Sequence, residues 1–204
     1  MYRKTLLATI ICFFSIVSLG QAEVISQSLP TPNMAGGKSL MQCLQARKST
    51  REFGRRAVNE QTLADLLWVA VGVNRQNGKR TIPTALNSQK IDVFVLKYDG
   101  VWLYKAQAHK LIKVSDKDLR AFVAEQDYAK EAALDLIYVS NSDAETEGAM
   151  YAGAAYQNVG LYCASKGLNN VVRAYFDRDG LRKELSLCDN QKIIISQAIG
   201  WPKK

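Results

Sequence analysis

The chain has 204 residues, with 27 Lys and Arg against 19 Asp and Glu, a net charge of +8. Its basic residues are spread along the sequence, without an aromatic-interleaved basic stripe or a recognition-helix motif, so nucleic acid is not an expected partner. His109 is the only histidine, which excludes multi-histidine metal centres, and no metal site is predicted. A chain of this length is expected to form one domain with a substantial core.

The N-terminus has the pattern of a signal peptide. Arg3 and Lys4 precede a mostly apolar run from Leu6 to Leu19, and Gly20-Gln21-Ala22 places small residues where export peptidases cleave. We expect cleavage after about Ala22 and an exported, periplasmic or secreted protein. An uncleaved anchor is the alternative, but about fourteen apolar residues fall short of the roughly 20 needed to cross a bilayer, so no stable membrane span is expected after cleavage.

Removing residues 1–22 takes away Arg3 and Lys4 and leaves 25 Lys and Arg against 19 Asp and Glu, a net charge of +6. Three cysteines then remain, namely Cys43, Cys163 and Cys188. No pair of them has the CxxC spacing, which argues against a zinc ribbon, a thioredoxin motif or a dense disulfide framework. One pairing could form outside the cytoplasm, and the sequence leaves open which one.

The first predicted elements are helical. Residues 23–38, rich in Pro and Gly, predict a flexible lead-in, after which 39–48 has helical apolar spacing. A second helix is expected after Asn59, a favourable cap, because Leu63, Leu66, Leu67 and Ala70 fall on one helical face. Trp68 lies beside this stripe, where a packed aromatic is the commoner outcome and a cover for a ring cofactor the alternative.

Strands and helices then alternate. A hairpin is predicted from 91–96 and 101–104 around Asp99-Gly100, followed by His109 in an exposed loop. A strand at 134–139 precedes a helix at 148–166, in which small residues line one side and Gly167 is the C-terminal cap. A strand at 171–176, a short helix capped by Asp177 and a strand at 192–199 complete the chain.

Two polar clusters carry the functional signal. The first is Arg47-Lys48-Ser49-Thr50-Arg51-Glu52-Phe53, whose planar guanidinium groups and short hydroxyl suit a phosphate or a ring carbonyl. A solvated basic surface is the alternative for this run taken alone. The second cluster spans 74–89 and contains Arg80-Thr81-Ile82-Pro83-Thr84-Ala85-Leu86-Asn87. Together the clusters suggest a site for a phosphorylated flavin.

With Gly153-Ala154-Ala155-Tyr156-Gln157-Asn158 and Ile199-Gly200-Trp201-Pro202, these segments resemble the nitroreductase-like flavoprotein superfamily, especially its short branch related to peptide azoline dehydrogenases. The four matches occur in the family's order and cover about residues 39–202. The resemblance implies an α+β fold, with a mostly antiparallel central sheet flanked by helices, formed by a domain at 39–204. It also implies a homodimer that binds flavin mononucleotide (FMN) at its interface.

The resemblance also assigns cofactor contacts. Arg47, Lys48 and Ser49 would bind the phosphate and ribityl end, and Arg51 would approach the N1/C2-carbonyl edge of the ring, where reduction places negative charge. Pro83, Thr84 and Asn87 would come from the other subunit. The chain ends at Lys203 and Lys204 where many relatives continue with a phosphate-binding arm. Two alternatives are open: these lysines substitute for that arm, or part of the contact with the phosphate is lost.

The leading functional hypothesis is an FMN-dependent oxidoreductase that transfers hydride through flavin N5 to a small acceptor such as a nitroaromatic or a quinone. NAD(P)H is the family's usual electron donor, but the predicted export leaves the donor open. Two alternatives are an azoline dehydrogenase-like enzyme acting on a peptide and an exported flavin-binding dimer without turnover. No catalytic residue is assigned, although the helix tyrosines Tyr151 and Tyr156 are candidate proton donors or, more commonly, packed core.

Overall fold

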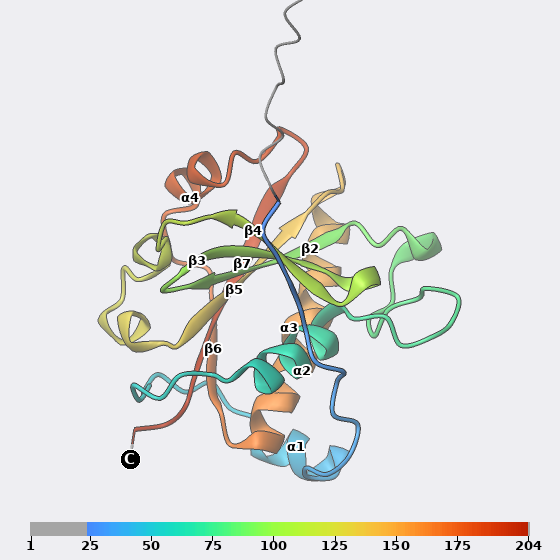
Figure 1. The fold of residues 1–204 in the computed structure, drawn as a ribbon, viewed down its shortest axis with the longest axis vertical. Helices are drawn as coiled ribbons and strands as arrows, with labels where there is room; N and C mark the ends of the chain where they lie inside the picture. The colour runs from blue at the N-terminus through green and yellow to red at the C-terminus, as the bar shows by residue number, and fades with distance from the viewer. Residues whose placement is uncertain (1–23, 204) are drawn as a thin grey trace, which may run out of the picture.

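The computed structural model describes residues 24–203, so the predicted signal peptide at 1–22 and Lys204 lie outside the described residues. Its helices are α1 (Leu40–Ala46), α2 (Glu60–Val71), α3 (Glu145–Lys166) and α4 (Arg178–Glu184) (Figure 1). Its strands are β1 (Ser26–Ser28), β2 (Ile91–Lys97), β3 (Gly100–Lys105), β4 (Lys110–Ser115), β5 (Leu134–Ser140), β6 (Asn169–Arg173) and β7 (Lys192–Gly200). Four short 3-10 turns join them, of which η1 (Ala85–Asn87) and η3 (Arg120–Val123) matter below.

The strands form one sheet in the order β1-β4-β3-β2-β5-β7-β6. Every pair of neighbouring strands runs antiparallel, with β2 at the centre between β3 and β5. The predicted α+β class with an antiparallel sheet flanked by helices is therefore confirmed. None of the helices within residues 24–203 has the length and apolar character needed to cross a membrane.

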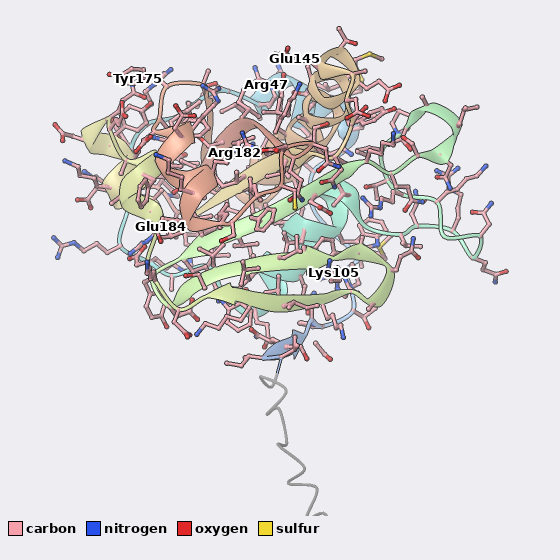
Figure 2. All side chains as sticks on the ribbon, turned by 90° about the horizontal axis from the view of Figure 1, so that it is seen from above. Arg47, Lys105, Glu145, Tyr175, Arg182 and Glu184 are labelled. Atoms are coloured by element: carbon pink, nitrogen blue, oxygen red, sulfur yellow. The ribbon has the colours of Figure 1, made fainter. Side chains whose placement is uncertain are left out.

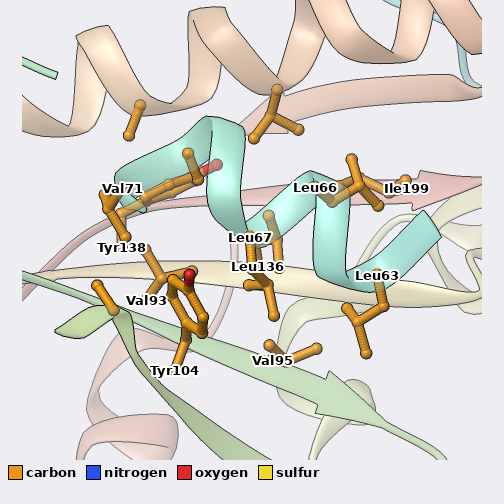
Figure 3. Packing of buried hydrophobic residues seen from close by; sticks show 14 of the residues in the cluster. Leu63, Leu66, Leu67, Val71, Val93, Val95, Tyr104, Leu136, Tyr138 and Ile199 are labelled. Carbon is orange, nitrogen blue, oxygen red and sulfur yellow. The ribbon is translucent and has the colours of Figure 1, made fainter. Parts of the chain in front are cut away.

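Helices α2 and α3 cover one face of the sheet. The predicted stripe of α2 is buried, and Figure 3 shows Leu67 above Leu136 of β5 and Leu66 beside Ile199 of β7. The helix begins as expected at Asn59, whose side chain accepts a hydrogen bond from the Thr62 amide at 2.8 Å. This hydrophobic packing fixes the position of α3. The Arg47–Phe53 segment and the 74–89 loop both rest on that helix.

The other face of the sheet is covered by α4 and η3. Phe94 and Leu96 of β2, which alternate with Val93 and Val95, pack there against Val123 and Leu181. Because β2 and β5 are buried on both faces, they read in the sequence as continuous apolar runs rather than alternating ones.

The segment predicted as a flexible lead-in is largely exposed but is tied to the domain at several points. Strand β1 pairs with β4, and Leu29 is buried, with its amide donating to the His109 carbonyl at 3.1 Å. The Lys38 amide donates to Ser165 Oγ at 3.0 Å, which ties the end of the segment to α3. Its Pro and Gly content indicated irregular backbone correctly, but irregular backbone with satisfied hydrogen bonds can be ordered.

His109 corrects a second expectation, because it is half-buried rather than exposed. Its Nδ1 lies 2.8 Å from the Tyr104 hydroxyl, and its Nε2 lies 2.8 Å from the Pro30 carbonyl oxygen. Strand β4, which follows His109 directly, was not predicted, because its alternation of lysine with apolar residues is short.

Candidate functional site

The Arg47–Arg51 segment leaves the end of α1 and runs beside the edge strand β6. Helix α1 starts at Ser39 with a capping box and ends at Arg47, whose extended backbone begins the segment. The Thr50 amide donates to the Asn170 carbonyl at 2.9 Å, and the Asn170 amide donates to Thr50 Oγ1 at 3.0 Å. Paired hydrogen bonds of this kind fix the segment as firmly as a strand would.

Arg47, Ser49 and Arg51 are all exposed, and within residues 24–203 none of their side chains makes a hydrogen bond or ion pair. The stem of Arg47 lies on α3, since a Cβ placed on Gly160 would be 3.6 Å from Arg47 Cγ. Figure 2 shows Arg47 at the surface. Two guanidinium groups and a hydroxyl with unused donors on an ordered segment are a donor set that fits a phosphate.

Lys48 has different surroundings from its neighbours. It lines a cavity of about 460 Å³ together with Thr50, Lys38, Cys163 and Asn170, whereas Arg47, Ser49 and Arg51 do not line it. Successive side chains of an extended segment point to opposite sides, which explains the separation. The arginines and Ser49 therefore form one group of donors, and Lys48 belongs to the other side of the segment.

The second cluster lies in the loop between α2 and β2, around η1. Tyr151 of α3 supports this loop: its hydroxyl accepts from the Ala85 amide at 3.0 Å and lies 3.4 Å from Ser88 Oγ. Within the loop, the Gln89 amide donates to Thr84 Oγ1 at 3.2 Å, and Gln89 Nε2 donates to Asn87 Oδ1 at 3.1 Å. Pro83 and Asn87 are exposed, whereas Tyr151 is buried and acts as a support.

A single chain does not bring the two clusters together. The loop rests on Tyr151 and Arg47 rests on Gly160, nine residues further along α3. At 1.5 Å per residue these positions are about 14 Å apart. Lys203 lies near neither of these contacts: it lines a separate cavity with Phe53, Gly54 and Arg55, beyond the end of the arginine segment. Lys204 lies outside the described residues.

A buried hydrogen-bond chain beneath the arginine segment was missed by the sequence analysis. Tyr138 donates to Gln197 Oε1 at 2.7 Å, and Gln197 Nε2 donates to Asn170 Oδ1 at 3.0 Å. Burial raises the pKa of Tyr138 well above its usual range, so its hydroxyl keeps the proton that it donates. The chain holds Asn170, which in turn holds Thr50. A glutamine inside the apolar run of β7 was the signal that could have revealed it.

Cysteines and acidic residues add no chemistry to this site. Cys43 and Cys163 are buried free thiols and Cys188 is an exposed one. Burial raises the pKa of Cys163, which makes its thiol unreactive. Over residues 24–203, no group of three or more histidine, cysteine or acidic side chains is arranged to hold a metal ion.

The chain as a whole is similar to known proteins. The nitroreductase family matches residues 44–201. A crystal structure of a protein from Ralstonia eutropha JMP134, provisionally named a nitroreductase, is 38% identical with a TM-score of 0.83, over 88% of this chain and 90% of that one.

Two further relatives agree with this match. A provisionally named nitroreductase of Methanocaldococcus jannaschii is 27% identical over 65% of this chain and 77% of its own length. A provisionally named nitroreductase from Desulfovibrio desulfuricans, solved in complex with FMN, shares the fold at 18% identity and a TM-score of 0.59, over 82% of this chain and 88% of that one. Because the family match spans most of its length, the chain belongs to the nitroreductase family.

Proposed function

We propose that this protein is an FMN-dependent oxidoreductase that passes two electrons, as a hydride, to a small oxidised acceptor such as a nitroaromatic or a quinone. The observation that carries the proposal is the group of free donors of Arg47, Ser49 and Arg51, held on β6 through Thr50 and Asn170. Membership of the nitroreductase family and the FMN complex of a protein with the same fold support the cofactor.

FMN, when bound, supplies a two-electron carrier whose N5 accepts and delivers hydride. The chain's own contribution is binding, orientation and charge. Arg47 and Ser49 would hold the phosphate and ribityl end, and Arg51 would supply a permanent positive charge to the ring. That charge favours the reduced state and so strengthens the oxidising power of the site. The roles of the three side chains are proposals from the family resemblance.

The proposed active form is a homodimer with the cofactor at the subunit interface. Because Pro83, Thr84 and Asn87 lie at the Tyr151 end of α3 and Arg47 lies at the Gly160 end, a second chain is needed to bring the two clusters to one ligand. From the family resemblance, Lys203 and Lys204 are proposed to add positive charge to the cofactor site. We also propose export through residues 1–22, which directs the search for the electron donor to extracytoplasmic reductants.

The test is to identify the small molecule released when the purified native protein is denatured. We expect FMN, seen by mass and by flavin absorbance bands that dithionite bleaches. Bleaching by NAD(P)H, followed by reoxidation with a nitroaromatic or a quinone, would support the reductase reaction. Bleaching by dithionite alone would favour a protein that needs another donor or lacks turnover. A different bound molecule, or no flavin after reconstitution with FMN, would overturn the proposal.

A further inference from the structure

The direction of the buried hydrogen-bond chain is fixed by one group that can only accept. Gln197 Nε2 lies 3.3 Å from the Tyr156 carbonyl oxygen and 3.0 Å from Asn170 Oδ1, so both of its hydrogens are used. Because a carbonyl cannot donate, the nitrogen of the Gln197 amide must face Tyr156, and its oxygen accepts from Tyr138. Asn170 therefore presents its oxygen to Gln197, and Asn170 Nδ2 is the free end of the chain.

This free end is an unused donor on a buried residue. Asn170 is only 7% exposed, and its main chain is paired with Thr50, yet its Nδ2 has no acceptor within residues 24–203. The nitrogen is not sealed from solvent, and Asn170 lines the cavity of about 460 Å³ on the Lys48 side of the arginine segment. Since buried donors are almost always paired, a free one that is reached through a cavity indicates an acceptor supplied by a ligand.

The charges around this cavity are positive. Lys38 and Lys48 line it from opposite ends of α1, which lies beside the C-terminal end of α3 (Figure 1). Both are exposed, and neither forms an ion pair within residues 24–203. No acidic side chain lines the cavity. At 1.5 Å per residue the ten positions between the lysines span about 15 Å, so two anionic groups a few bonds apart match them better than a single ion does.

We propose that this cavity binds a small aliphatic dicarboxylate. One carboxylate lies at Lys48 and Asn170 Nδ2, which are joined through Thr50, and the other lies at Lys38, whose main chain is held on α3. Ala164 and Leu168 supply apolar wall for the carbon chain between them.

The dicarboxylate site is separate from the proposed cofactor site. Arg47, Ser49 and Arg51 do not line this cavity, because they project from the other side of the extended segment. The inference therefore goes beyond the proposed function and does not depend on a bound flavin.

Calorimetric titration with succinate and with butyrate tests the charge pattern, because these acids share a four-carbon chain and differ by one carboxylate. The protein is titrated as purified and again after saturation with FMN, at constant ionic strength. We expect saturable binding of one succinate per chain and at least about tenfold weaker binding of butyrate, since one charge-assisted contact is lost. No saturable succinate binding, or equal affinity for both acids, would overturn the inference.

Three variants locate the binding. Lys48→Ala and Lys38→Ala should each weaken succinate binding about tenfold. Lys192→Ala, which removes an exposed lysine at the opposite end of β7, is the matched control and should leave the affinity unchanged. Unchanged affinity in both Lys48→Ala and Lys38→Ala would overturn the inference.

Asn170→Asp tests the free donor. It keeps the oxygen that accepts from Gln197 and replaces Nδ2 with an oxygen that repels a carboxylate, so succinate binding should be lost. Circular dichroism would verify the fold, and because Asn170 is buried, the exposed Lys48→Ala variant decides if Asn170→Asp does not fold.

Thermal unfolding separates a ligand site from a purely structural role. Lysines near the C-terminal end of α3 also compensate the helix dipole, so Lys48→Ala could lower the melting temperature for that reason alone. We expect succinate to raise the melting temperature of the native protein and of Lys192→Ala, but to raise that of Lys48→Ala much less. The same rise in all three proteins would overturn the inference.

Flavin content, read in the same samples, separates this inference from the proposed function. Succinate binding that FMN leaves unchanged would support a separate site. Competition between succinate and FMN would place the cavity within the cofactor site and would overturn the inference alone. Succinate binding by a protein that cannot be loaded with FMN would support the inference and overturn the cofactor proposal.

Discussion

Asp135 and Arg173 form an ion pair inside the protein, with Asp135 Oδ1 3.0 Å from Arg173 Nη2 and the two side chains only 1% and 2% exposed. The pair joins β5 to β6 across β7, on the face covered by η3. Asp135 Oδ2 and Arg173 Nε and Nη1 have no hydrogen-bond partner among residues 24–203. Two charges taken out of water and incompletely hydrogen-bonded contribute little net stability as a pair, but each becomes costly when the other is removed.

The first prediction concerns the cost of removing only one of the two buried charges. Arg173→Met should lower the free energy of unfolding by about 3–5 kcal/mol, because it leaves the buried Asp135 carboxyl without its hydrogen-bonded counter-charge. The double variant Asp135→Leu with Arg173→Met should lose less than Arg173→Met alone. Urea unfolding measures both. Arg182→Met, which removes an exposed partner of Asp189, is the control and should change little. A double variant less stable than the single one would contradict this account.

The second prediction is a pH dependence of stability. Burial raises the pKa of Asp135 to about 7 from an ordinary value of 3.8, against the opposing pull of Arg173 and Arg120. The folded state therefore binds this proton more tightly than the unfolded state does. Its stabilising contribution is complete below about pH 4 and is lost as the pH rises through 7.

Asp135→Asn removes this titration and serves as the reference. The free energy of unfolding of the native protein, minus that of Asp135→Asn, should fall between pH 4.5 and 7.5, as urea unfolding at several pH values would show. Other titrating groups cancel in the difference. A difference that is flat or that rises over this interval would show that the carboxyl is not held protonated by burial.

Much of the fold followed from local sequence signals. Asn59 and Gly167 mark helix ends because capping and left-handed backbone depend on one residue type, and the α2 stripe is long enough to be unambiguous. Strand β1 escaped prediction because its three residues have no apolar pattern and pair only with a distant strand. The strand predicted at 171–176 lies instead at Asn169–Arg173 as β6. The prediction ran too far because Phe176 packs in the core without being part of the strand.

The candidate site was predictable in composition but not in geometry. Arg47, Ser49 and Arg51 were predicted as cofactor contacts from their residue types, and the structure shows that all three are exposed on an extended segment after α1. That Lys48 faces a different cavity depends on how Thr50 pairs with Asn170, a contact between residues 120 positions apart. The support from Gln197 and Tyr138 is likewise a long-range relation that periodicity cannot reveal.

The third prediction concerns His109. A carbonyl oxygen only accepts, so His109 Nε2 donates to Pro30, and in the neutral ring Nδ1 accepts from Tyr104. Burial raises the pKa of Tyr104, which keeps the hydroxyl proton in place for this bond. His109→Leu should lower the free energy of unfolding by about 1–3 kcal/mol, because two partners lose their hydrogen bonds. Tyr104→Phe, which removes one bond, should cost less. Urea unfolding measures the stability of the two variants and the native protein. Equal stability of all three would show that these two hydrogen bonds do not stabilise the fold.

The fourth prediction concerns export. Expression of the full chain in a Gram-negative host should yield a periplasmic protein whose N-terminus is Glu23, as N-terminal sequencing of the osmotic-shock fraction would show. Ala22→Arg should block cleavage, because the peptidase accepts only small residues there, and should leave a larger precursor. An unprocessed native protein retained with the membrane would instead favour the anchor.

The last prediction separates the two sides of the arginine segment. Arg47→Ala and Arg51→Ala should each weaken FMN binding by about 1.5–3 kcal/mol, the usual contribution of a hydrogen bond to a charged group. Lys48→Ala, which changes the neighbouring charge but not the free donor group, should have a smaller effect because Lys48 lines the other cavity. Titration of the apoprotein with FMN, followed by flavin fluorescence, gives all three affinities.

Arg51→Lys keeps the charge but loses the planar fork, so it should recover part of the Arg51→Ala loss. Equal losses in Arg47→Ala and Lys48→Ala would mean that net positive charge, rather than the directed donors, retains the cofactor.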